Sequence, residues 1–162
     1  MKQSNMEEKH KEYMQEAIRL SLENIDNNGG PFGAVIVKDG KIIAKGANRV
    51  TCSNDPTAHA EVVVIREAAK NLNDFNLSGC TIYTSCEPCP MCLAAIYWAR
   101  IDRIFYGNTK TDAKKIGFDD SFIYDEIKLP VEKRSIQTSQ ILEHEAIKGF
   151  KKWEVFEGKT EY

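Results

Sequence analysis

The sequence lacks the features of a membrane or secreted protein. No apolar run approaches the roughly 20 residues that a membrane-spanning helix needs. Residues 1–9 are polar and partly acidic, without the apolar core of a signal peptide. These absences predict a cytoplasmic protein that makes no contact with a membrane.

The sequence also lacks a block of basic residues. Its net charge is −2, whereas proteins that bind long nucleic acids through phosphates carry clustered Lys and Arg. Nucleic acid is therefore not the expected partner, although binding of one short loop stays open.

A disulfide framework is absent too. The chain has five cysteines, an odd number, and three of them, Cys86, Cys89 and Cys92, follow a C-x-x-C-x-x-C spacing. Such close spacing indicates metal binding in a reducing compartment. Cys52 and Cys80 are expected to be buried or bystander thiols. A length of 162 residues with 42% hydrophobic and 28% charged residues, and no repeat or linker, predicts a single domain over residues 1–162.

Two short motifs carry the chemistry of this chain. They are His59-Ala60-Glu61 and Pro88-Cys89-Pro90-Met91-Cys92. One imidazole and two thiolates bind Zn²⁺ and leave its fourth position open for water, as in catalytic sites. Bound zinc lowers the pKa of that water to about 7. The motifs therefore predict one zinc ion per subunit in a catalytic centre.

The local structure expected around these motifs supports a shared site. Pro88 and Pro90 bracket Cys89, which places its thiolate at a helix start, where the helix dipole favours negative charge. Cys92, three residues later, lies on the same helical face. Glu61 is two residues from His59 and so points elsewhere, which suits a proton carrier outside the ligand set.

A structural zinc site is the alternative from a different class. Cys86 together with His59, Cys89 and Cys92 would form a closed Cys₃His site without an open position. Glu61 would then have no role, and the protein would be a non-catalytic zinc-binding module. The favoured interpretation makes Cys86 a small buried residue behind the metal.

Hydrophobic periodicity and turn residues predict a layered α/β fold. The first expected elements are a helix over 9–25 and a hairpin of strands 32–37 and 41–46 that turns at Asp39-Gly40. A helix then starts from an N-cap at Asp55 and runs to about 71, followed by a strand over 81–84, a helix over 90–99 and a strand over 103–106. The last third is expected to contain short helical turns or loop over 111–125, a possible fifth strand over 135–142 and a helix over 143–156. This order predicts a three-layer α/β/α sandwich.

Four segments resemble the cytidine deaminase superfamily and, within it, the small bacterial guanine deaminases. The segments are 30–35, 53–61, 85–92 and 117–124. The zinc motifs are shared across the superfamily and specify the reaction type. The Phe118-Asp119-Asp120-Ser121 segment and the terminal Tyr162 are similar to guanine deaminases in particular.

The resemblance implies a five-stranded mixed sheet and a homodimer with exchanged C-terminal segments. It also implies the site roles. By this resemblance, His59, Cys89 and Cys92 bind zinc, Glu61 transfers protons, and Asp120 assists at the exocyclic amine. Phe32 contacts the purine ring, Asn48 contacts its polar edge, and the backbones of Ala60 and Ser85 make further contacts. A partner's Tyr162 closes the site. From the residues alone, Phe32 could equally be a core residue and Asn48 a turn residue.

The predicted activity is that of a hydrolase acting on C–N bonds of cyclic amidines. Guanine, converted to xanthine and ammonia, is the predicted substrate. A tRNA adenosine deaminase that forms inosine is the nearest alternative because it shares the zinc motifs, followed by a guanosine or cytosine deaminase.

Overall fold

The computed structural model describes residues 2–162 of the chain. Its contacts divide the chain into two compact units, the first ending at Asp120 and the second running from Ser121 to Tyr162. All four strands lie in the first unit, and the second is built of helices and irregular segments. Within residues 2–162, no helix combines the length and the apolar character needed to cross a bilayer.

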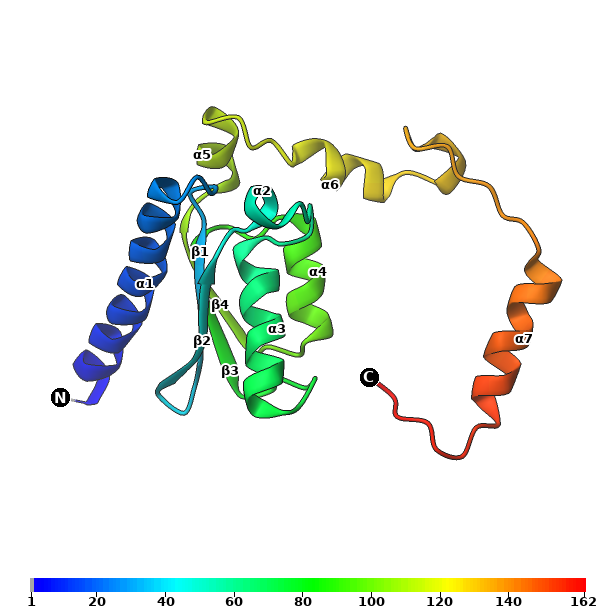
Figure 1. The fold of residues 1–162 in the computed structure, drawn as a ribbon, viewed down its shortest axis with the longest axis horizontal. Helices are drawn as coiled ribbons and strands as arrows, with labels where there is room; N and C mark the ends of the chain where they lie inside the picture. The colour runs from blue at the N-terminus through cyan, green and yellow to red at the C-terminus, as the bar shows by residue number, and fades with distance from the viewer. Residues whose placement is uncertain (1) are drawn as a thin grey trace. The chain divides into compact units, whose positions relative to one another are not determined.

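The first unit is organised around a mixed four-stranded sheet (Figure 1). Its elements are α1 (Lys2–Asp26), β1 (Gly33–Lys38), β2 (Lys41–Ala47), α2 (Val50–Ser53), α3 (Ala60–Leu72), β3 (Cys80–Cys86), α4 (Pro90–Trp98), β4 (Arg103–Asn108) and α5 (Lys110–Lys115). The strand order is β2-β1-β3-β4. β1 is antiparallel to both of its neighbours, and β3 is parallel to β4. Strands β2, β3 and β4 therefore all point the same way.

Helices cover both faces of this sheet, α1 on one side and α3 with α4 on the other (Figure 1). Alternate residues of β1 point to opposite faces, as in any strand. Ala34 and Ile36 join the core beneath α3 and α4, while Val35 packs on Ala17 of α1. The α/β layering predicted from the order of elements is confirmed.

The hairpin turn and the contact with α1 both depend on glycine. Asp39 and Gly40 have φ values of 50° and 72°, the left-handed pair that a two-residue hairpin turn requires. At Gly33, a Cβ would lie 2.3 Å from the carbonyl oxygen of Ala17. The backbone of α1 therefore approaches β1 more closely than any side chain there would allow.

Two expectations about elements are wrong. Residues 135–142 form no strand, so the sheet has four strands rather than five. These residues follow a 3₁₀ turn at Val131–Lys133 in the second unit. The apolar pattern of a segment does not by itself supply the neighbouring strand that its backbone hydrogen bonds require.

The helix expected from Asp55 begins instead at Ala60. The carboxylate of Asp55 accepts hydrogen bonds from the backbone amide and the hydroxyl of Thr57, at 2.9 and 2.7 Å. This local turn competes with helix formation. As a result His59, with extended φ and ψ of −65° and 155°, occupies the N-cap position of α3.

The second unit contains α6 (Ser121–Lys128) and α7 (Glu143–Glu154). The helix predicted over 143–156 is confirmed, ending two residues earlier than expected. None of the residues Ser121–Tyr162, all of which the structure describes, is buried. Along α7 the apolar side chains of Ile147, Phe150 and Trp153 are exposed.

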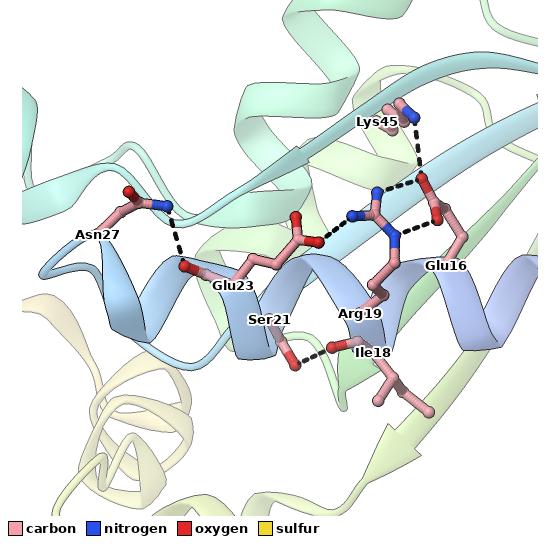
Figure 2. A network of polar contacts seen from close by, with 7 residues as sticks. All are labelled: Glu16, Ile18, Arg19, Ser21, Glu23, Asn27 and Lys45. Atoms are coloured by element: carbon pink, nitrogen blue, oxygen red, sulfur yellow. Dashed lines mark hydrogen bonds and ion pairs between the residues drawn. The ribbon is translucent and has the colours of Figure 1, made fainter.

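A polar network links α1 to β2 (Figure 2). The carboxylate of Glu16 accepts hydrogen bonds from Arg19 Nε at 2.7 Å and from Lys45 Nζ at 2.9 Å. Arg19 also pairs with Glu23. Hydrogen bonds from Arg19 and Lys45 lower the pKa of Glu16 to about 2.

This network predicts a pH-dependent contribution to stability. Because the pKa of Glu16 is lower in the folded chain, its ion pairs stabilise the fold above the unfolded pKa of 4.5 and lose that effect as the pH falls toward 2. We expect Glu16→Gln to lower the free energy of unfolding by up to about 1 kcal/mol at neutral pH. Urea unfolding at a series of pH values measures the difference, with Glu23→Gln as a control of smaller effect. A difference from wild type that does not change with pH would contradict this account.

Candidate active site

The site lies where two helices begin at one edge of the sheet. α3 follows β2 and α4 follows β3, and these strands point the same way. Both helix N-termini are therefore at the carboxyl edge of the sheet, on the face that α3 and α4 cover. His59 is the N-cap of α3 and Cys89 the N-cap of α4. The partial positive charge of helix N-termini favours thiolates and other anions here.

Three predicted ligand residues converge at this point. The Nδ1 atom of His59 lies 3.5 Å from Sγ of Cys89 and 3.5 Å from Sγ of Cys92. Nitrogen and sulfur ligands at ordinary zinc distances, set at the tetrahedral angle, are about 3.5 Å apart. The three residues are thus in position to bind one metal ion, and their nitrogen and thiolate donors fit zinc, as the sequence predicted.

The start of α4 follows from its sequence. Pro90 occupies the first turn, where its missing N–H breaks no helical hydrogen bond. The sulfur of Cys89 accepts a hydrogen bond from the backbone amide of Cys92 at 3.5 Å. This hydrogen bond makes the sulfur of Cys89 the cap of the helix and also orients it toward the cluster.

The electrostatics of the cluster favour a cation. A hydrogen bond from Cys92 lowers the pKa of Cys89 to about 4. The pKa of Cys92 is raised because it shares its proton with Cys89 and is buried. The pKa of His59 is raised by its hydrogen bond with Cys89. A bound metal ion replaces these protons, so metal binding releases them and is pH-dependent.

Glu61 is a buried carboxylate beside the cluster. Its side chain, on a residue that is only 6% exposed, accepts a hydrogen bond at Oε1 from the hydroxyl of Thr84 at 3.1 Å. Its other oxygen, Oε2, lies 3.4 Å from Sγ of Cys92. Burial raises the pKa of Glu61, which brings a carboxyl group closer to the range where it can both accept and donate protons.

Cys86 lies outside the ligand group. Among residues 2–162, the group of side chains placed to hold a metal comprises His59, Cys89 and Cys92. The thiol of Cys86, buried at the end of β3, donates to the carbonyl oxygen of Thr109 at 3.7 Å, and burial raises its pKa to about 11. Cys86 therefore has a partner of its own outside the ligand group, and this geometry favours the three-ligand arrangement over Cys₃His.

Asp120 interacts with this cluster through its charge. Its negative charge contributes to the raised pKa of His59, and burial followed by the charge of Cys89 raises the pKa of Asp120 itself. The adjacent Asp119 instead pairs with Lys114 at 2.9 Å. The pKa shifts link Asp120 to His59 and Cys89 by charge, and its role at the amine stays a prediction.

Phe32 and Asn48 meet through the backbone at the start of β1 and the end of β2. The amide of Asn48 donates to the carbonyl oxygen of Phe32 at 2.9 Å. The ring of Phe32 is half-buried and meets the ring of Phe118 edge to face, with centroids 4.9 Å apart. Asn48 is buried, and its side-chain oxygen accepts from the amide of Val50 at 3.2 Å. This bond fixes the amide group so that its NH₂ end is the one directed away from Val50.

Three residues that were predicted to contact the substrate remain to be placed: Ala60, Ser85 and Tyr162. Ala60 is fully buried as the first residue of α3. Ser85, also buried, accepts a hydrogen bond at its hydroxyl from the amide of Gly33 at 3.0 Å. Tyr162 is the last residue of the second unit.

Thr84 is the site residue that sequence reasoning missed. It follows Ile82 and Cys80 on the face of β3 that packs against α3 and α4. A polar residue at an inward-facing position of a buried strand needs a hydrogen-bonding partner. That pattern was the available signal, and the partner is Glu61.

Comparison with known proteins relates this arrangement to deaminases. Residues 7–108 match the family model described as the cytidine and deoxycytidylate deaminase zinc-binding region. The chain is 54% identical over 154 residues to a guanine deaminase of Bacillus subtilis, an alignment that covers 94% of this chain and 99% of that protein. A tRNA-specific adenosine deaminase of Agrobacterium fabrum is 52% identical over 77 residues, which cover 48% of this chain and 51% of that protein.

The fold agrees with these similarities. An X-ray structure of guanine deaminase from Bacillus subtilis superposes with a TM-score of 0.92 at 55% sequence identity, and the match covers 94% of this chain and 98% of that one. The similarity therefore extends well beyond the zinc-binding region.

Proposed function

The chain belongs to the cytidine and deoxycytidylate deaminase zinc-binding family, and on this premise we propose that it deaminates guanine. The reaction consumes one water and converts guanine to xanthine and ammonia. One observation carries the choice of substrate: the similarity to a guanine deaminase spans 94% of this chain and 99% of that protein. The family model ends at residue 108, so it does not reach Asp120.

The side chains of the site fit the chemical steps. His59, Cys89 and Cys92 hold the zinc ion, which when bound lowers the pKa of a water to about 7. Glu61 accepts a proton from the attacking water and gives it to the ring nitrogen beside the carbon that bears the amine. The same carboxyl group, or Asp120, then moves the second proton of the added water from the new hydroxyl to the departing amine, which leaves the carbonyl of xanthine and ammonia.

Substrate selection is assigned to the residues around the cluster. Phe32 contacts the purine ring, and Asn48 donates from its fixed NH₂ group to an acceptor on the edge of the base. The backbones of Ala60 and Ser85 contact the base and the leaving amine. A buried polar group left without its partner disfavours a wrong base strongly, so these contacts would set specificity.

Release of ammonia by the purified protein tests the proposal. Guanine, guanosine, adenine, cytosine, cytidine and a tRNA anticodon hairpin are compared side by side. We expect activity on guanine. Activity confined to the hairpin would replace guanine by an RNA adenosine and leave the zinc chemistry standing, whereas inactivity on all six would favour a non-catalytic zinc module.

A homodimer with exchanged C-terminal segments is proposed as the assembly. None of the described residues Ser121–Tyr162 is buried, and α7 exposes Ile147, Phe150 and Trp153. Exposed apolar surface of this kind marks an interaction site, and exchange of identical segments is a common route to dimers. Residues 121–162 of one copy would complete one domain with residues 1–120 of a second copy.

A cytoplasmic location is proposed as well, because the free thiols of the site suit a reducing compartment.

The proposed dimer assigns Tyr162 to closing the partner's active site. We expect deletion of Tyr162 to lower guanine turnover roughly tenfold, since loss of a closing residue lets the substrate move from its reactive position. Steady-state kinetics measure the effect, and the zinc content should stay at one ion per chain. Tyr162→Phe, which keeps the ring, serves as the control. Unchanged kinetics after the deletion would reject this role.

A further inference from the structure

Thr84 and Glu61 form a buried hydrogen-bonded pair beneath the metal cluster. The hydroxyl of Thr84 donates to Oε1 of Glu61 at 3.1 Å. The two residues are 1% and 6% exposed. A carboxylate taken out of water needs hydrogen bonds from the protein, so this bond has a direct effect on how Glu61 is held.

The donor lies on one of the two central strands of the sheet. β3 pairs with β1 on one side and β4 on the other, and Thr84 stands opposite Ala34 and Tyr106 in the two registers. A β-branched side chain in a strand also has little freedom about χ1. The Thr84 hydroxyl is therefore a rigid reference point within the fold.

The two oxygens of Glu61 have different surroundings. Oε1 is held by Thr84, whereas Oε2 lies 3.4 Å from Sγ of the metal ligand Cys92. The oxygen on the metal side is thus Oε2.

We propose that Thr84 is a positioning residue that anchors Glu61 through Oε1 and leaves Oε2 to accept and deliver the proton. This inference rests on the proposed deaminase function. The Glu61 side chain rotates about three bonds, and without the anchor its carboxylate turns away from the reactive position. A displacement of about 1 Å at a reacting group can cost up to 10²-fold in rate. Because Thr84 is buried and acts through Glu61, we expect its loss to affect the chemical step and not substrate binding.

Three substitutions test the proposal in the zinc-loaded protein. Thr84→Val keeps the shape and removes the hydroxyl, and Thr84→Ser restores a hydroxyl on a smaller side chain. Thr81→Val makes the same change on the opposite face of β3 and is the matched control. For Thr84→Val we expect kcat on guanine to fall about tenfold or more, with KM within about twofold of wild type. Thr84→Ser should recover most of kcat, and Thr81→Val should match wild type.

Two further readouts separate positioning from a structural role. Zinc content should stay at one ion per chain in all variants, and melting temperatures should not follow the loss in kcat. Should Thr84→Val fail to fold, Thr84→Ala replaces it in the comparison with serine. An unchanged kcat without the hydroxyl, an equal loss in the serine variant, or loss of zinc would each overturn the inference. If wild type itself releases no ammonia from guanine, it is the proposed function that fails.

Discussion

Replacing Glu61 by glutamine is expected to reduce guanine turnover by about 10³- to 10⁴-fold while zinc remains bound. Glutamine keeps the size of the side chain and can still accept from Thr84, but it cannot take up and release a proton. The ligand atoms of His59, Cys89 and Cys92 are untouched by the change. The test measures guanine turnover and, by atomic absorption, zinc content on the same preparation. It then compares the loss of turnover with the zinc that is retained.

Glu67→Gln is the matched control for this experiment. Glu67 is on the same helix, α3, but is exposed, so the same change there should leave turnover as in wild type. A Glu61→Gln protein with undiminished activity would remove the proton carrier from the mechanism. It would also leave a non-catalytic zinc module as the better description of the fold.

Cys92→Ser is expected to weaken zinc binding by at least about a hundredfold and to abolish turnover. The substitution replaces one of three protein ligands with a neutral hydroxyl, and even groups that only support zinc ligands contribute 10- to 100-fold to affinity. Competition with a chromophoric chelator measures the affinity. Added zinc should restore turnover in chelator-stripped wild type and not in the variant.

Cys86→Ala provides the contrasting result. The thiol of Cys86 bonds to the carbonyl oxygen of Thr109 and lies outside the ligand group. We therefore expect full zinc content after its removal, with a loss of stability limited to one small buried side chain. Loss of zinc from Cys86→Ala would mean that a Cys₃His site forms, and the open coordination position that catalysis needs would be absent.

The sequence was informative about the site because the ligand motifs are local. Cys89 and Cys92 are one helical turn apart, and Pro90 marks where that turn begins. Two ligands could therefore be placed on one face without knowing the fold. The hairpin at Asp39-Gly40 was predictable for the same reason, since its backbone conformation is set by the two turn residues.

Two expectations failed because a local sequence pattern is compatible with more than one structure. Residues 135–142 contain apolar residues at spacings that permit a strand, but they do not join the sheet. Asp55 is followed by proline, as at many helix starts, yet its carboxylate is engaged by Thr57 and α3 begins later. Residues 135–142 pair with no other strand among residues 2–162, whereas the start of α3 is displaced by a local hydrogen-bonded turn.

The sequence by itself determined the zinc ligands and the reaction class and predicted the proton carrier, because each of these follows from residue chemistry at short spacing. Only the tertiary structure decided that Cys86 lies outside the ligand group and that Thr84 is hydrogen-bonded to Glu61. Thr84 and Glu61 are 23 residues apart. Their contact arises because β3 and α3 pack together, which places the strand's inward-facing hydroxyl beside the first turn of the helix.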